Sequence, residues 1–177
     1  MKKSILFVLS LAVAIAASGC AAGGNQLENV DINAAVEAST LKMSDYKNDL
    51  EGLEQYLKAL NYIPENAVAA DMMYNVIGAV DGDRFNFTVN RSQVFVELYE
   101  FNPDALNEDA QRVINEVKKD GKFYVFDDKS LQENAAFDAT LSDNGKYLLI
   151  YTNQSTSEDH EKRKTDFTNV VKTFYNG

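Results

Sequence analysis

The chain has 177 residues, and 17 basic against 27 acidic side chains give it a formal net charge of −10. This acidic balance argues against a nucleic-acid partner, because proteins that bind nucleic acid usually carry a basic face. The single cysteine excludes an intrachain disulfide and a cysteine-cluster zinc site. An apolar content of 45% is too high for a disordered chain, and the length fits one domain with an appendage.

The first residues have the features of an export signal. Lys2 and Lys3 precede an uncharged, mostly apolar run at residues 5–17. That run is shorter than the ~20 residues that a membrane-spanning helix needs, and small residues follow it. The segment is therefore predicted to be a cleaved signal peptide.

The signal ends in the sequence Ala17-Ser18-Gly19-Cys20, which resembles the lipobox of bacterial lipoproteins. It departs from that pattern at Ala17, where the family more often has leucine. The resemblance implies that Cys20 becomes the first mature residue and carries a lipid. The alternative is a plain signal peptide cut elsewhere in the alanine-rich stretch, which would leave Cys20 incidental.

Processing would change the net charge of the protein and its location in the cell. Loss of residues 1–19 removes two lysines and no acidic residue, so the net charge goes from −10 to −12. Lipid on Cys20 would hold this acidic chain to a membrane outside the cytoplasm. In a Gram-positive cell the lipid would lie in the outer leaflet of the cell membrane. In a Gram-negative cell it would lie in the outer membrane.

Composition divides the mature chain into a tether and a domain. Residues 20–45 contain no aromatic side chain, whereas 18 phenylalanines and tyrosines fall in residues 46–177. We therefore expect a lipidated tether over 20–45, in which residues 30–36 have the spacing of a short helix. A single domain is expected over 46–177.

The first half of the domain is expected to contain two helices and two strands. Ser44 is predicted to cap a helix that runs to Leu60, because leucines recur after it at three- and four-residue steps. Pro64 is predicted to start a second helix that runs to about Gly78. Alternating apolar residues then predict strands over 84–90 and 94–100, joined by a hairpin at residues 90–92.

The second half is expected to form a helix, three strands and a final helix. Asn102 is predicted to cap the helix, which ends at Lys118-Lys119 before Gly121. A strand is expected over 122–127. Residues 135–141 and 146–151 are expected to pair around the turn Asp143-Asn144-Gly145. The last helix is predicted to begin near Ser155, with Glu158 completing a capping box.

In this order of elements, consecutive strands are mostly joined by hairpins, and strands do not alternate strictly with helices. The sequence therefore predicts an α+β fold, with a mainly antiparallel sheet of about five strands and helices packed on one face.

Few residues have the pattern of a catalytic or metal site. Asp81-Gly82-Asp83 could begin a calcium loop, but the twelfth position is Ser92 where an EF-hand needs glutamate, so a polar turn is favoured. Asp127-Asp128 has no partner carboxylate in the sequence pattern. His160 and the basic run 162–164 are interpreted as solvated parts of the last helix.

Four tyrosines lie on predicted strands and admit two interpretations. They could form an aromatic binding patch on an open sheet face, or they could fill the core. These residues are Tyr99, Tyr124, Tyr147 and Tyr151.

Three short motifs in the domain resemble small uncharacterised lipoproteins of Firmicutes. They are Ile77-Gly78-Ala79-Val80-Asp81-Gly82, Val96-Glu97-Leu98-Tyr99-Glu100-Phe101 and Asn144-Gly145-Lys146-Tyr147-Leu148-Leu149. The resemblance implies an exported lipoprotein, and it assigns no activity, cofactor or site residue other than the lipidated Cys20.

The sequence therefore favours a non-enzymatic binding module of the cell envelope, whose partner would be a protein, peptide or glycan. One alternative is a hydrolase of cell-wall material, which needs two carboxyl groups about 5–10 Å apart in a cleft. A calcium-dependent adhesion module is a further alternative. No cofactor is expected.

Overall fold

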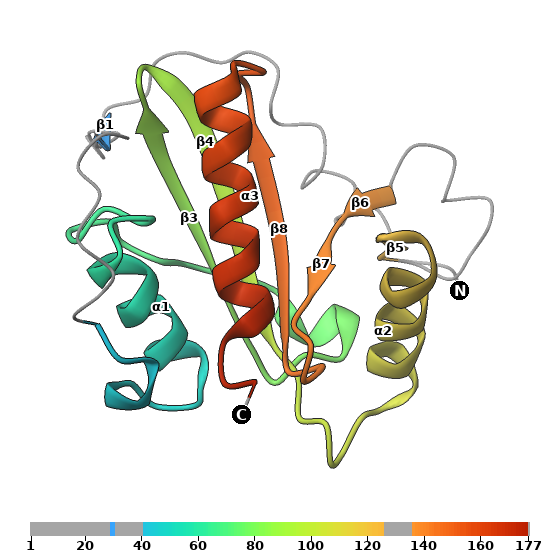
Figure 1. Cartoon of the computed structure of the whole chain (residues 1–177). Coiled ribbons are helices and arrows are strands. Elements are labelled where there is room, and N and C mark those ends of the chain that lie inside the picture. Colours follow the sequence, from blue (N-terminus) through green and yellow to red (C-terminus); the bar gives the residue numbers. More distant parts are fainter. Residues whose placement is uncertain (1–28, 31–40, 126–135, 177) are drawn as a thin grey trace.

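The computed structural model describes residues 29–30, 41–125 and 136–176 (Figure 1). Cys20 and the pair Asp127-Asp128 lie outside these ranges, so the structure does not bear on the predictions made for them. The described part of the chain is an α+β fold with a mainly antiparallel sheet, as predicted.

Two long strands and a third one form the centre of the sheet. The six strands of this sheet are β1 (Asn29–Val30), β2 (Ala70–Asp71), β3 (Asp81–Val89), β4 (Ser92–Glu100), β7 (Thr140–Leu141) and β8 (Tyr147–Asn153). Their order is β1-β3-β4-β8-β7, and β2 pairs with β3 on the same side as β1. Only the β1–β3 pair is parallel. Residues 29–30 form a strand, and residues 31–36 of the short helix predicted in the tether lie outside the described residues.

The β3–β4 hairpin has the connection that the sequence predicts. Its turn is formed by Asn90 and Arg91, which both have positive φ angles, of 44° and 69°. Positive φ at both positions is typical of the two-residue turns whose twist matches that of the flanking strands. Along β3, buried residues alternate with more exposed ones, which fixes one apolar face.

That apolar face is covered by two helices, α1 (Leu50–Ala59) and α3 (Glu158–Thr173) (Figure 1). The core between them is built from alternate residues of the three central strands and from the buried stripe of each helix. Its largest fully buried members include Phe85, Phe87, Tyr147, Phe167 and Phe174.

A second core lies on the opposite side of the sheet. Helix α2 (Glu108–Asp120) packs there against Leu148 and Ile150, together with a small separate sheet of β5 (Lys122–Tyr124) and β6 (Ala136–Asp138). Helices therefore cover both faces, whereas the sequence predicted helices on one face. The second core arises because β8 is buried on both of its faces.

The helices start later than predicted, and a different side chain from the predicted one caps α1 and α2. Asp49, rather than Ser44, accepts a hydrogen bond from the backbone N–H of Gly52 at 2.8 Å and caps α1. Asn107, rather than Asn102, caps α2. The capping box at Ser155 is also wrong, since α3 begins after Ser157 and no side chain caps it.

The helix predicted from Pro64 to Gly78 does not form. The segment instead contains the short strand β2 and the 3₁₀ helix η3 (Tyr74–Ile77); another such turn, η2 (Met43–Asp45), precedes α1. Ala67 and Ala69 pack against the α1–α3 core, and Met72 and Tyr74 pack against the α2 core. Side chains of this segment thus pack into cores on opposite sides of the sheet. An extended backbone allows this, because it directs successive side chains to opposite faces, whereas a helix does not.

The predicted hairpin of residues 135–151 forms only near its turn. Gly145 has a positive φ of 73°, and β7 pairs with β8 on either side of this turn. Residues 136–138 instead form β6, which pairs with β5 in the separate sheet. The strand predicted at residue 122 begins there, as β5.

Candidate functional site

All three large apolar side chains that are highly exposed in the described part of the chain lie between residues 68 and 80. Val68 is 80% exposed, Met73 60% and Val80 51%. These residues flank β2 and precede β3, at the outer side of the sheet. Scattered exposed apolar residues are ordinary, but a concentration of them in one segment indicates a contact surface.

Acidic side chains lie along the same edge. Asp71 of β2 is exposed and stands directly opposite Asp83 of β3. Because the two strands are antiparallel, the chain after Asp71 runs alongside the chain before Asp83. Met73 therefore lies on the same side of this pair as Asp81 and Val80. We name the exposed part of this region the β2 edge surface; it consists of Val68, Ala70, Asp71, Met73, Val80 and Asp81.

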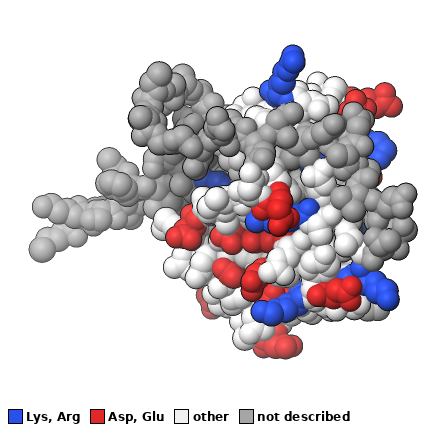
Figure 2. All heavy atoms as spheres, turned by 90° about the vertical axis from the view of Figure 1, so that its left-hand side faces the viewer, with Lys and Arg blue, Asp and Glu red and all other residues white. Residues whose placement is uncertain are grey.

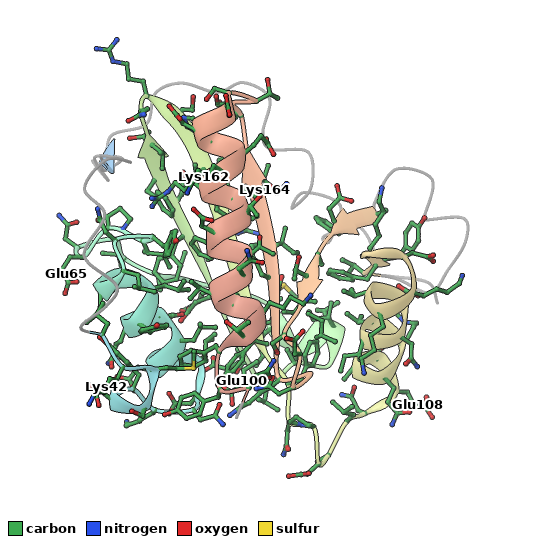
Figure 3. All side chains as sticks on the ribbon, in the orientation of Figure 1. Lys42, Glu65, Glu100, Glu108, Lys162 and Lys164 are labelled. Atoms are coloured by element: carbon green, nitrogen blue, oxygen red, sulfur yellow. The ribbon has the colours of Figure 1, made fainter. Side chains whose placement is uncertain are left out.

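Figure 2 looks onto the side of the molecule that carries α1 and the β3 edge, and acidic side chains gather near the middle of that view. Glu65, in the loop after α1, projects outward from the same side (Figure 3). A ligand that approaches from this direction therefore meets a negative field.

Behind the edge surface, Glu54 of α1 shares a hydrogen bond with Asp83 of β3. Two carboxylates cannot share a hydrogen bond unless one of them is protonated. Burial and the nearby Asp83 charge raise the pKa of Glu54 to about 8, and burial also raises the pKa of Asp83. The buried Oε1 of Glu54 has no hydrogen-bond partner, so a negative charge there would lack a donor. Both effects favour a proton shared by the pair.

Lys58, one turn further along α1, moderates this negative charge. It lowers the pKa of both carboxyl groups. Its ammonium group donates a hydrogen bond to the carbonyl of Ala67 at 3.1 Å and lies 5.6 Å from the centre of the Phe85 ring. Asp71 and Asp81 are both exposed at the edge, where Asp81 accepts a hydrogen bond from the backbone N–H of Gly82 at 2.9 Å.

The structure brings the three lipoprotein-like motifs together at one end of the sheet. Asp81 pairs across the strands with Glu100, and Glu100 pairs with Tyr147. The Glu100 carboxylate accepts a hydrogen bond of 2.6 Å from the backbone N–H of Leu50 and forms an ion pair of 3.2 Å with Lys146 (Figure 3). Glu100 thus fixes the start of α1 on the sheet, which is a structural role.

Two residues that the sequence placed in solvent are buried. His160 is 3% exposed and Arg163 is 7% exposed. Arg163 donates 2.8 Å hydrogen bonds to the carbonyls of Asn61 and Tyr62, and its guanidinium group lies 5.3 Å from the centre of the Tyr62 ring. It therefore ties α3 to the chain that leaves α1. Lys162 is exposed as predicted and pairs with Asp166.

Three of the four tyrosines on predicted strands fill the core, and this confirms one of the two interpretations for them. Tyr99, Tyr147 and Tyr151 are buried, and only Tyr124 is partly exposed. Asp81-Gly82-Asp83 also differs from its predicted turn, since all three residues belong to β3. Within the described ranges, no group of three or more histidine, cysteine or acidic residues is placed to hold a metal ion.

The search of the described helices for a membrane span found none that is sufficiently long and apolar. Comparison of the chain with protein-family models, with curated proteins and with solved structures gave no match.

Sequence reasoning singled out Asp81, but it missed Asp71 of the edge surface and Glu54 behind it. Glu54 lies beside a leucine in an ordinary amphipathic helix, and Asp71 lies in a segment that was predicted to be helical. The only available signal was the concentration of Val68, Met72, Met73 and Val80 in one stretch, and Met72-Met73 reads equally well as core.

Proposed function

We propose that this protein is a lipid-anchored module of the cell envelope that binds a protein or peptide partner through the β2 edge surface. The observation that supports it best is the placement of Val68, Met73 and Val80. They are exposed on one strand edge, while the other large apolar residues of the described chain are at least partly buried. Exposed apolar side chains with charged side chains beside them are typical of protein contact sites.

The proposed address rests on the sequence. Lipid on Cys20, the first residue after the export signal, would keep the domain at the outer side of a membrane. Two acyl chains or more give stable attachment, so the domain itself needs no membrane-binding face. Its edge surface is then left for a partner in the envelope.

The hydrolase alternative is less well supported. Its two carboxyl groups would need a separation of about 5–10 Å, with room for the substrate between them. Glu54 and Asp83 share a hydrogen bond, which leaves no room for a substrate between them. Asp81-Gly82-Asp83 does not support a calcium-binding loop, because these residues lie within strand β3.

The anchor is tested by metabolic labelling with an alkyne fatty acid in cells that produce the protein. We expect the wild-type chain to be labelled and to sediment with membranes, and Cys20→Ala to lose the label. A chain with Ser18→Thr is the control, because it changes the signal and keeps the cysteine. A labelled Cys20→Ala chain would refute the anchor.

Binding is tested with the lipidated, C-terminally tagged chain and its own solubilised envelope. We expect a Val68→Ser, Met73→Ser, Val80→Ser variant to lose the partner that the wild type captures. These side chains are exposed, so their replacement should leave the unfolding midpoint unchanged. The matched control replaces three exposed polar residues elsewhere with serine (Gln111, Asn169 and Thr152). Equal loss of the partner in both variants would contradict the proposed site.

A further inference from the structure

The β2 edge surface includes backbone that no described strand pairs. β2 contacts β3 on one side only, and no other described strand lies beside it. In an antiparallel ladder, alternate residues direct both N–H and C=O toward the partner strand, and the residues between direct theirs outward. One residue of the Ala70–Asp71 pair therefore offers its backbone donor and acceptor to an added strand, as in β-strand addition.

The two faces of this edge differ in chemistry. Asp71 faces the same side as Asp83, where the Glu54–Asp83 pair and Asp81 make the surface negative. Ala70 faces the other side, together with Arg84. Arg84 already forms an ion pair of 2.5 Å with Glu97, so its charge is satisfied. Val68, two residues before Ala70, is the most exposed apolar side chain of the surface.

An added strand places successive side chains on opposite faces of the sheet. One set would then face Asp71 and Asp81, and the other would face Ala70 and Val68. Basic side chains suit the first face, because they complement carboxylates. Apolar side chains suit the second face, because they cover exposed apolar surface.

We propose that the partner binds as an extended segment, in which basic and apolar residues alternate, added as a strand to the edge of β2 that no described strand pairs. This inference rests on the proposed function and specifies the chemistry of its partner. Two other occupants fit less well. A membrane surface offers no backbone to pair with β2, and an anionic membrane would be repelled by Asp71 and Asp81. A second copy would bring another acidic chain, of net charge −12 after loss of residues 1–19, against the same acidic edge.

The test uses the full lipidated chain in nanodiscs of neutral phosphatidylcholine and a fluorescent seven-residue peptide of alternating lysine and valine. Fluorescence anisotropy measures its affinity. Three comparison peptides carry the same lysines and valines in two blocks, glutamate in place of lysine, or N-methyl groups on alternate amides. We expect each comparison peptide to bind at least about tenfold more weakly, since each removes alternation, charge complementarity or backbone pairing.

Protein variants locate the site. Asp71→Asn with Asp81→Asn should weaken the alternating peptide about tenfold, as expected for the loss of two charge contacts. Asp104→Asn with Asp159→Asn removes the same net charge from exposed positions elsewhere, and its affinity should equal that of the wild type. Equal affinities for both protein variants, or for the alternating and block peptides, would overturn the proposal.

Other outcomes also overturn it, and they separate it from the proposed function. The unlipidated Cys20→Ala chain could also bind vesicles. If Val68→Ser abolished that binding, the surface would be assigned to a membrane. Self-association that Val68→Ser abolishes would assign it to a second copy. If the peptide does not bind but the serine variant of the three apolar residues still loses its envelope partner, only the inferred chemistry fails. If that variant also keeps its partner, the proposed function fails as well.

The Glu54–Asp83 pair provides an independent readout. Above a pH of about 8 this pair loses its shared proton, while lysine stays charged. Affinity for the alternating peptide should therefore rise about threefold from pH 6.5 to pH 9. In Glu54→Gln the rise should disappear. An equal rise in that variant would contradict the placement of the basic residues beside the pair.

Discussion

At the scale of single residues, the carboxyl pair between α1 and β3 is the chemically most unusual feature of the described chain. Glu54 keeps its proton because ionisation would place a second charge beside Asp83 in a partly buried position. The surrounding charges are Asp71 on β2, Asp81 on β3 and Lys58 on α1. Lys58 offsets only part of the repulsion, so the balance favours the shared proton.

This pair makes the stability of the protein depend on pH. The folded chain keeps a proton on Glu54 up to about pH 8, whereas the unfolded chain loses it near the ordinary pKa of 4.5. Stability therefore falls as pH rises between these values, because the folded state binds more protons there. We expect a loss of about 2 kcal/mol from pH 5 to pH 8, after allowance for solvent screening. Urea unfolding at several pH values measures it.

Glu54→Gln is the informative variant, since the amide stays neutral and can still donate a hydrogen bond to Asp83. Its pH slope should be smaller than that of the wild type over this range. Glu51→Gln, on the exposed side of the same helix, should keep the wild-type slope. A wild-type slope in Glu54→Gln would show that other groups cause the pH dependence.

The buried basic residue of α3 illustrates a limit of sequence reasoning at this scale. Arg163 stands between two lysines, and such a run usually lies in water. The structure buries it because the carbonyls of Asn61 and Tyr62, at the end of α1, need donors. Those acceptors lie a hundred residues away in sequence, so no local pattern could predict the contact.

At the scale of elements, η3 and α2 meet so closely that one position admits only glycine. Gly78 has a φ of 74°, and a Cβ there would lie 2.5 Å from the backbone N of Ala110 and nearer still to the side chain of Asn107, which caps α2. We expect Gly78→Ala to cost about 3 kcal/mol, since strain and steric overlap add.

Gly121 provides the matched control for that prediction. It has a similar φ of 67° at the end of α2, but a Cβ there would meet nothing within 4 Å. Gly121→Ala should therefore cost only about 1 kcal/mol, from backbone strain alone. Both values come from chemical denaturation. Equal costs at the two positions would mean that the close approach of η3 to α2 does not contribute.

Elements with a strong local pattern were predictable. The period-two alternation of β3 and β4 and the stripe of α2 each determine the structure with little help from distant residues. The segment 64–78 was not predictable in this way. Its alanines and methionines are compatible with a helix, and only the two cores, which draw alternate side chains apart, make it extended.

At the scale of the whole molecule, the α+β class follows from the order of the elements, but the second core does not. The β8 sequence is apolar on both faces, which is a signal for burial on both sides. The candidate site is less predictable still. It combines residues of β2, of β3 and of the segments next to them through a pairing register that exists only in the folded chain.

For the whole molecule, the proposed contact with the partner lies at the edge of β2. Site-specific photo-crosslinking in intact cells tests this claim most directly, with benzoylphenylalanine at position 68 and, as a control, at position 111 on the exposed side of α2. We expect position 68 to yield a discrete crosslinked species that Asp71→Asn with Asp81→Asn diminishes, and position 111 to yield none. The same species from both positions, or none from position 68, would contradict the claim.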